Sequence, residues 1–285
     1  MNNILRLITA VIMSVTMSGC EMQPVDYTPD IPDNPQFAVH YIDVGQADAA
    51  LIECDGETMM IDGGNVADSK IIAAYLKKQD ISYLDYVVCT HAHEDHVGGL
   101  SGALSVAEAD HILAPVTEAD SKAYGNFKKK AEEQGVVIEH PVVGDAFLLG
   151  NGLVEIFGPV KENSKDKNNT SIVLKITYGN TSFLFTGDAE RGEEEDILNT
   201  GADLKSTVLK VGHHGSETST SYPFLRAVMP QYSVISVGEG NSYGHPNADV
   251  LSRLSDAGSE VYRTDINGDI VMTSDGQTVT VITEK

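Results

Sequence analysis

The sequence predicts a mixed α/β domain in which two β-sheets pack face to face with helices on their outer faces, an αββα sandwich. From residue 37 onward, short runs rich in β-branched and aromatic residues alternate with segments of helical periodicity. The two halves of this region are similar in make-up, because each begins with strands and ends in mixed strand–helix units. Two packed sheets with outer helices bury the apolar faces of both halves. No linker interrupts the pattern, so residues 37–285 are interpreted as one domain.

The predicted elements follow from the period of the apolar residues. In the first half, strands are predicted at Phe37–Val44, Ala49–Cys54, Thr58–Ile61, Tyr86–Thr90 and His111–Ala114, and helices at Ser69–Gln79, Val97–Leu104 and Glu118–Gln134. The second half opens with a meander at Ala146–Leu149, Leu153–Phe157, Ser171–Tyr178 and Ser182–Thr186. Later strands are predicted at Thr207–Val211, Tyr232–Val237, Glu260–Arg263, Asp269–Ser274 and Thr278–Ile282, with helices near Arg191–Asn199, Tyr222–Val228 and Ala248–Asp256.

The charge balance restricts the classes of partner. Acidic side chains outnumber basic ones by 42 to 19, and the formal net charge is −23. Such a field repels polyanions and favours cation uptake, so no stable nucleic-acid binding is expected. The dense basic run at residues 128–130 falls on a predicted helix and is interpreted as a solvated face.

The first twenty residues are predicted to be a lipoprotein signal peptide. Arg6 precedes an apolar stretch from Leu7 to Met17, which is too short to span a bilayer as a helix. The following Ser18-Gly19-Cys20 resembles the bacterial lipobox, although Met17 replaces the usual Leu; an ordinary secretory signal is the alternative. Residues 21–36, rich in Pro and Asp, are predicted to be a tether. We therefore expect an exported protein, anchored at the cell envelope through an N-terminal lipid alone.

The other two cysteines lie in apolar, strand-like runs. Cys54 and Cys89 are interpreted as small buried core residues, with a disulfide between them as the alternative.

A dense histidine cluster carries the strongest functional information. Thr90-His91-Ala92-His93-Glu94-Asp95-His96 follows an apolar strand and precedes a helical pattern. Imidazole nitrogens and carboxylate oxygens are ligands of borderline divalent metals such as Zn²⁺. On an extended segment His91 and His93 point to the same side and can share one ion. Asp95 and His96, after the turn, are placed for a second ion.

This cluster resembles the signature of the metallo-β-lactamase superfamily. Further motifs narrow the resemblance to the hydrolase domain of the ComEC/Rec2 DNA-uptake proteins and to the related phosphorylcholine esterase: Asp43-Val44-Gly45-Gln46-Ala47-Asp48, Ile61-Asp62-Gly63-Gly64, Asn168-Asn169-Thr170-Ser171, Thr186-Gly187-Asp188, His213-His214-Gly215-Ser216 and Tyr243-Gly244-His245-Pro246. The resemblance extends from about Phe37 to the C-terminus. It implies an αββα fold, a two-metal hydrolytic centre and often a phosphodiester substrate.

The resemblance also assigns ligands outside the cluster. It implies that Asp188, at the end of an apolar strand, bridges the two ions; a helix N-cap is the alternative. Of His213 and His214, one is expected to complete the second ion's ligands, and we favour His214. The other would then face the substrate as a hydrogen-bond donor or acid.

One departure concerns the first ion. No third histidine suited to it appears between His96 and Asp188, since neither His111 nor His140 has a suitable turn. The first ion would then have His91, His93 and Asp188, which favours weak binding or exchange of Zn²⁺ for Mn²⁺.

Several other polar residues are assigned supporting roles. Asn169 is interpreted either as a ligand-orienting or substrate-binding residue or as a turn residue. His245 is expected to contact a phosphate oxygen or to protonate a leaving group, with a structural loop histidine as the alternative. Asp48 and Asp62 are expected to orient imidazole rings, and Ser216 is interpreted as a turn residue rather than a nucleophile.

The predicted function is a binuclear metal-dependent hydrolase, with a phosphodiesterase or phosphoesterase favoured. Two cations would lower the pKa of a shared water enough to supply hydroxide, with Asp95 as ligand and proton acceptor and His213 and His245 as candidate donors. Hydrolysis of a lactone, thioester or β-lactam is the first alternative, against which the missing third histidine counts. A non-catalytic metal-binding protein is the second.

Overall fold

The computed structural model describes residues 36–116, 119–161 and 166–285. The predicted signal peptide, the lipid anchor at Cys20 and the tether up to residue 35 lie outside the described residues. Glu118, the predicted start of a helix, also lies outside them; that helix is described from Lys122.

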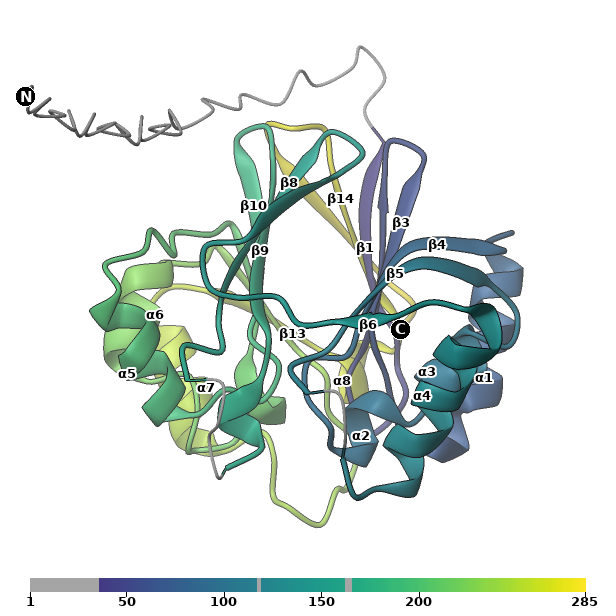
Figure 1. The fold of residues 1–285 in the computed structure, drawn as a ribbon. Helices are drawn as coiled ribbons and strands as arrows, with labels where there is room; N and C mark the ends of the chain where they lie inside the picture. Colours follow the sequence, from purple (N-terminus) through teal and green to yellow (C-terminus); the bar gives the residue numbers. More distant parts are fainter. Residues whose placement is uncertain (1–35, 117–118, 162–165) are drawn as a thin grey trace, which may run out of the picture.

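Two β-sheets pack face to face, which confirms the predicted sandwich (Figure 1). The eight strands of the first sheet are, in spatial order, β15 (Val279–Thr283), β14 (Ile270–Ser274), β1 (Phe37–Tyr41), β2 (Ala49–Cys54), β3 (Glu57–Gly63), β4 (Tyr83–Val88), β5 (Glu108–Leu113) and β6 (Ile138–Glu139). The seven strands of the second are β13 (Glu260–Arg263), β12 (Tyr232–Ile235), β11 (Val208–Lys210), β10 (Thr181–Phe185), β9 (Val173–Tyr178), β8 (Gly152–Gly158) and β7 (Ala146–Leu149).

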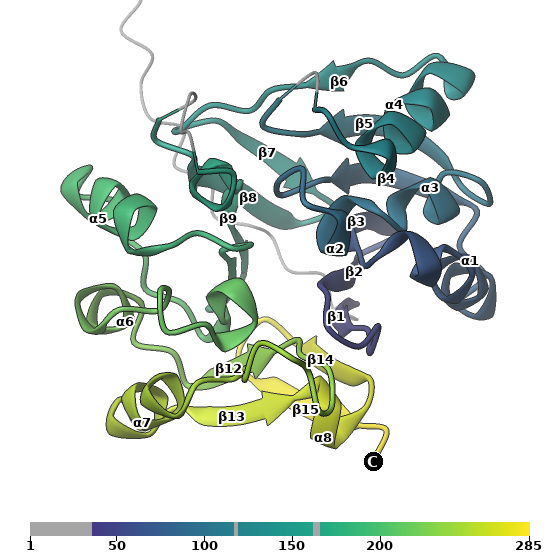
Figure 2. The ribbon, with the colours of Figure 1, turned by 90° about the horizontal axis from the view of Figure 1, so that it is seen from below.

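Helices cover the outer faces of both sheets (Figures 1 and 2). The first sheet is covered by α1 (Ser69–Lys78), α2 (Glu94–Val97), α3 (Leu100–Ala103) and α4 (Lys122–Gln134). The second is covered by α5 (Arg191–Asn199), α6 (Tyr222–Val228) and α7 (Ala248–Asp256), and α8 (Thr264–Asn267) links β13 to β14. Short 3₁₀ turns occur at η1 (Val66–Asp68), η2 (Asn168–Thr170) and η3 (Gly212–Gly215).

Three apolar layers hold the fold together. The central layer fills the space between the sheets and includes Tyr41, Tyr178 and Phe183. An outer layer packs the first sheet against α1 to α4, and another packs the second against α5 to α7. Because strands contribute alternate residues to the two sides of a sheet, both faces of each sheet are buried.

The last two strands return to the first sheet. β14 pairs antiparallel with β1, and β15 lies outside it. The Asp269 carboxylate accepts a hydrogen bond of 2.8 Å from the Asp43 backbone N–H near this junction. The first sheet therefore contains both ends of the described chain.

Parallel strands bring their carboxyl ends to one end of the molecule. β3 to β6 are parallel in the first sheet, and β10 to β13 are parallel in the second. The segment after β4 leads directly into α2 at this end (Figure 1). Loops that follow these strands are consequently neighbours in space.

The helix predicted at Val97–Leu104 is confirmed only in part: α3 (Leu100–Ala103) lies within it, but Val97 ends a separate helix, α2. Gly98 and Gly99 separate them where the backbone touches the end of β3. The Gly99 N–H donates to the Gly64 carbonyl at 3.0 Å, and a Cβ on Gly99 would overlap the Gly63 carbonyl. This contact needs glycine, and it lies between α3 and the helix that carries Asp95 and His96.

Other differences are smaller. β4 and β5 begin earlier than predicted, and β6 and α8 were not predicted, since both are short and mixed in polarity. Cys54 and Cys89 are buried and unpaired, so the core interpretation is confirmed and the alternative disulfide is wrong.

We expect Gly99→Ala to lower the free energy of unfolding by about 3 kcal/mol, because rigid backbone faces the added methyl group. Gly125→Ala in α4 is the matched control. No atom lies within 4 Å of its added Cβ, so a gain of roughly 0.5–1 kcal/mol from helix propensity is expected. Urea denaturation measures both; equal effects would contradict the proposed backbone contact.

Candidate metal centre and active site

The candidate site lies where the parallel strands of both sheets end. Ligands of α/β proteins bind beyond the carboxyl ends of strands, because loops rather than paired backbone lie there. The predicted metal ligands come from three such loops: His91, His93, Asp95 and His96 follow β4, Asp188 follows β10, and His214 follows β11.

The first group of candidate ligands is His91, His93 and Asp188, whose ligand atoms lie within 4.8 Å of one another. His91 Nε2 is 3.0 Å from His93 Nδ1 and 3.8 Å from Asp188 Oδ2. Two imidazole nitrogens and a carboxylate oxygen fit a borderline divalent cation. Across the described part of the chain no third histidine joins this group, so solvent or substrate would complete the coordination.

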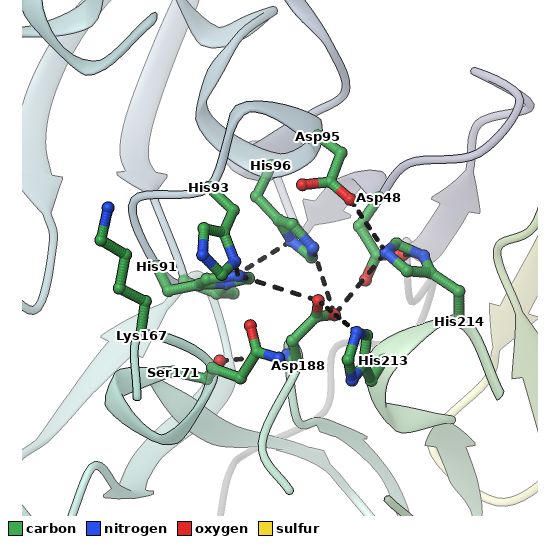
Figure 3. A network of polar contacts seen from close by, with 12 residues as sticks. Asp48, His91, His93, Asp95, His96, Lys167, Ser171, Asp188, His213 and His214 are labelled. Atoms are coloured by element: carbon green, nitrogen blue, oxygen red, sulfur yellow. Dashed lines mark hydrogen bonds and ion pairs between the residues drawn. The ribbon is translucent and has the colours of Figure 1, made fainter. Parts of the chain in front are cut away.

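The second group is Asp95, His96, Asp188 and His214, by the same distance. His96 Nε2 lies 3.1 Å from Asp188 Oδ1, and His214 Nε2 lies 3.4 Å from Asp95 Oδ2. Asp188 belongs to both groups and lies centrally, with contacts to four surrounding imidazoles (Figure 3). Its two oxygens face different groups, which is the arrangement needed for a shared ligand.

Unpaired polar atoms indicate that this cluster fits metal ions. His96 Nε2, His214 Nε2 and Asp188 Oδ1 are buried and face one another at 3.1 and 3.7 Å, but none of them makes a well-aligned hydrogen bond with the described residues. Buried polar atoms in proteins are nearly always paired, since desolvation without a partner is costly. A divalent cation between these atoms would satisfy all three.

The electrostatics of the cluster also favour cations. Burial, reinforced by His96, lowers the pKa of His91 well below its usual range, so this ring is neutral. Burial opposes protonation of His96 and His214 too, but the Asp188 carboxylate leads a set of acidic groups that outweighs it. The pKa of His96 is raised well above its usual range, and that of His214 to about 10. Metal ions compete with these protons, so metal binding releases them.

Asp62 orients His96. Its Oδ2 lies 2.7 Å from His96 Nδ1, and it accepts hydrogen bonds from the Thr90 hydroxyl and backbone N–H at 2.6 and 2.8 Å. Burial raises the pKa of Asp62 despite these contacts. A carboxylate behind a ligand imidazole fixes the ring and leaves the other nitrogen free for metal.

Asp48 occupies the equivalent place behind His214, but with a buried cation beside it. Asp48 Oδ1 is 3.1 Å from His214 Nδ1, and its Oδ2 is 2.8 Å from Lys210 Nζ. Lys210 is only 4% exposed and also donates to the Val211 carbonyl at 3.1 Å. Burial opposes ionisation of Asp48, yet Lys210 and His214 lower its pKa well below the usual range. Asp48 therefore remains a carboxylate.

Backbone strain accompanies the ligands. Asp62, His213 and His214 have φ values of 56°, 49° and 52° in the left-handed region. For residues other than glycine this conformation costs about 1–2 kcal/mol each. The His214 side chain is buried in the cluster, while the His213 side chain is 24% exposed.

An open cavity of about 300 Å³ gives access to the cluster. Besides candidate ligands, its lining contains Gln46, Glu94, Asn168, His213, Tyr243 and His245. His213 Nε2 is 3.7 Å from Asp188 Oδ2, and His213 Nδ1 is 3.2 Å from Glu190 Oε1. The His245 ring lies 5.8 Å from that of His213, and burial, then His213, lowers its pKa.

The two neighbouring asparagines, Asn168 and Asn169, make different contacts. The Asn169 side chain accepts hydrogen bonds from the Glu190 and Glu193 backbone N–H groups at 3.1 and 3.3 Å and so holds the start of α5. Asn168, 9% exposed, faces the cavity instead, and its Oδ1 is buried without a hydrogen bond. The turn interpretation of Asn169 therefore agrees with its contacts, and Asn168 was the residue that sequence reasoning missed.

His111 and His140 lie outside the candidate site, and Ser216 is part of a turn. His111 contacts Glu139 at 2.9 Å, and His140 contacts the Ala114 carbonyl at 2.6 Å, in a separate cavity. The buried Ser216 hydroxyl contacts Thr218 at 3.0 Å, as a turn residue does.

Comparison with protein families decides the family. The family model described as "Metallo-beta-lactamase superfamily" matches residues 42–239. This chain belongs to the metallo-β-lactamase superfamily. The superfamily consists generally of metal-dependent hydrolases, and the match spans every candidate metal ligand.

Relatives with competence and recombination names confirm the ComEC/Rec2-like resemblance. The chain is 31% identical over 250 residues to ComE operon protein 3 of Bacillus subtilis, covering 81% of this chain and 32% of that protein. It is 33% identical over 247 residues to Competence protein ComA of Neisseria gonorrhoeae, with 86% and 33% covered. Recombination protein 2 of Haemophilus influenzae is 30% identical over 245 residues, with 83% and 29% covered. The chain thus spans about a third of the length of these relatives.

Solved structures agree on the fold. The metallo-beta-lactamase fold protein YhfI from Bacillus subtilis has a TM-score of 0.53 at 12% identity, over 87% of this chain and all of that one. CmlA, a diiron beta-hydroxylase from Streptomyces venezuelae, has a TM-score of 0.55 at 12% identity, over 88% and 55%. At such identities the likeness concerns the fold alone. Among the described helices, none has both the length and the apolar character needed to cross a bilayer.

We expect Lys210→Met to lower the free energy of unfolding by about 3 kcal/mol, because it removes the lysine that pairs with the buried Asp48 carboxylate and leaves only His214 beside it. The double variant Lys210→Met/Asp48→Asn should recover most of this loss. Lys175→Met is the control: Lys175 is also buried, but its partner Glu155, 3.6 Å away, is half-exposed. Urea denaturation of the metal-free protein measures all three, and equal losses for both single lysine variants would refute the special role of Lys210.

Proposed function

We propose that this protein is an extracytoplasmic metal-dependent phosphodiesterase or phosphoesterase. The observation that carries the proposal is the pair of imidazoles outside the ligand groups. His213 and His245 line the open cavity beside Asp188, where a substrate next to two ions would lie. Hydrolysis of a phosphodiester develops charge on the phosphoryl oxygens and on the leaving oxygen, and both need donors.

The six candidate ligands would hold two divalent cations, Zn²⁺ in our proposal and Mn²⁺ as the alternative: His91, His93, Asp95, His96, Asp188 and His214. When bound, the cations supply Lewis-acid stabilisation and lower the pKa of water. Asp95, whose side chain is about one-third exposed at the cavity, is placed to accept a proton from solvent.

His213 and His245 have separate roles in this proposal. Glu190 holds the Nδ1 of His213, and the Glu190 carboxylate is itself fixed by the Thr218 hydroxyl at 2.8 Å. The Nε2 of His213 therefore faces the cavity and can deliver a proton to the leaving oxygen. His245, further from Asp188, donates a hydrogen bond to a phosphoryl oxygen.

The net charge supports a small or surface-attached substrate, and the N-terminal sequence supports a location outside the cytoplasm. A formal charge of −23 disfavours stable binding of long polyanions and favours a small or surface-attached phosphoester. The apolar segment from Leu7 to Met17, followed by Cys20, supports export and attachment to the membrane through a lipid.

The purified chain should bind about two metal ions and hydrolyse bis(p-nitrophenyl) phosphate. Asp188→Asn and His93→Ala should lower turnover by roughly 100-fold or more, because each removes a candidate ligand. His111→Ala, which changes an exposed histidine outside the site, should retain turnover. Metal analysis and release of p-nitrophenolate provide the readouts. Hydrolysis of nitrocefin or a lactone without phosphodiester turnover would refute the proposed substrate class.

The leaving group distinguishes the two histidines. His213→Ala should lower kcat/KM by about 100-fold for a phosphodiester with an alkyl leaving group, and by less than about tenfold for p-nitrophenolate, which departs without a proton. His245→Ala should lower kcat/KM similarly for both leaving groups. Glu190→Gln is the matched variant and should follow His213→Ala in direction. If instead the effect of His245→Ala depended on the leaving group and that of His213→Ala did not, the roles proposed for the two histidines would be exchanged.

A further inference from the structure

A tyrosine at the rim of the cavity has no part in the chemistry described above. Tyr243 lines the same cavity as Asp188 and His213, and it is 72% exposed. An isolated exposed aromatic residue is common on protein surfaces and needs no explanation. Tyr243 differs because its position is fixed and because it continues the wall of the active site.

The loop that carries Tyr243 is braced by its own side chains. Asn241 Oδ1 accepts hydrogen bonds from the backbone N–H groups of Tyr243 and His245, both at 3.1 Å. Asn241 Nδ2 donates to the carbonyls of Gly238 and His245 at 3.0 and 2.6 Å. The Gly238 N–H in turn donates to Gln46 Oε1 at 3.1 Å, which ties this loop to the loop after β1. The ring therefore needs little further ordering to accept a ligand.

One face of the Tyr243 ring is supported from within the site. It stacks on the His245 ring, with centroids 5.8 Å apart and planes inclined by 19°. His245 lies edge-to-face with His213 at 5.8 Å, and His213 lies 3.7 Å from Asp188. Two ring contacts thus separate Tyr243 from the carboxylate shared by the metal groups. These contacts place Tyr243 on the same wall of the cavity as the shared carboxylate.

The cavity also contains unpaired polar atoms. Asn168 Oδ1 and His245 Nδ1 are buried, make no hydrogen bond with the described residues, and belong to residues that line the cavity. Asn168 is 9% exposed, and its amide nitrogen contacts Glu190 at 3.3 Å, so the free oxygen is held in place. Two polar atoms without a hydrogen bond therefore lie in the wall of the cavity next to the aromatic ring.

We propose that Tyr243 is a ring-binding platform, and that the substrate is a phosphoester that carries a planar or sugar ring. This inference rests on the proposed function and names its substrate class. The outer face of Tyr243 stacks on the substrate ring, while His245 beneath it contacts the phosphoryl group. Tyr243 then selects between esters that the metal groups would otherwise treat alike.

Binding of phosphate monoesters to the metal-loaded chain tests the platform. The probes are methyl phosphate, which lacks a ring, phenyl phosphate, which has a planar ring, and ribose 5-phosphate, which has a sugar ring. Each affinity is measured by competition against hydrolysis of bis(p-nitrophenyl) phosphate and directly by calorimetry. We expect at least one ring-bearing ester to bind about tenfold more tightly than methyl phosphate, since stacking on an aromatic side chain contributes on that scale. The ester that shows this preference distinguishes a planar from a sugar ring.

Two variants decide whether Tyr243 produces the preference. Tyr243→Ala should reduce the ratio of methyl to ring-ester dissociation constants to about one, and Tyr243→Phe, which keeps the ring, should preserve it. An unchanged ratio in Tyr243→Ala, or no ring preference in the unmodified chain, would overturn the platform while leaving the proposed function intact. A quaternary ammonium group also stacks on aromatic rings, so a response of phosphocholine alone would overturn the ring assignment. If the unmodified chain binds no phosphate ester and hydrolyses none, the proposed function itself fails.

Discussion

The structure of the site depends on one buried carboxylate. Asp188 is almost fully buried, and its carboxylate oxygens lie within 4 Å of imidazole nitrogens of His91, His96 and His214. A negative charge in this position is stable only next to positive charge, whether on protons or on metal ions. Its neighbours, Asp48 and Asp62, add further negative charge behind the ligand rings. The cluster is therefore built for cations and is costly to keep without them.

The fold meets this requirement by dividing the tasks between its two sheets. The first sheet supplies Asp62 and the loop with His91 and His96, and the second supplies Asp188 and His214. The ligands meet only because the carboxyl ends of the parallel strands lie at the same end of the sandwich. Lys210 belongs to the second sheet but neutralises Asp48 of the first, so this ion pair joins the two layers beneath the site. The cluster is therefore complete only when the two sheets are packed against each other.

Sequence reasoning predicted what is encoded locally. The αββα architecture, most strand positions and the two-ligand spacing of His91 and His93 follow from residue patterns within a few positions. Asp188 and His214 were assigned by resemblance. The break between α2 and α3 was missed, because it depends on a contact between Gly99 and Gly63 that no local pattern reveals. The choice between Asn168 and Asn169 depends on the 3₁₀ turn that contains both. Lys210, a charged residue in the apolar run Val208–Val211, was a visible anomaly, but its partner Asp48 is distant in sequence.

The return of β14 to the first sheet has a consequence for the order of assembly. β1 lies between β2, its neighbour in the chain, and β14, which is synthesised long after β1. Until β14 is available, one edge of β1 has no partner, and exposed strand edges pair readily with other chains. Such long-range pairing also folds slowly, because a long loop must close first. A nascent chain of this protein therefore gains most from remaining unfolded, or shielded by another factor, until β14 has emerged.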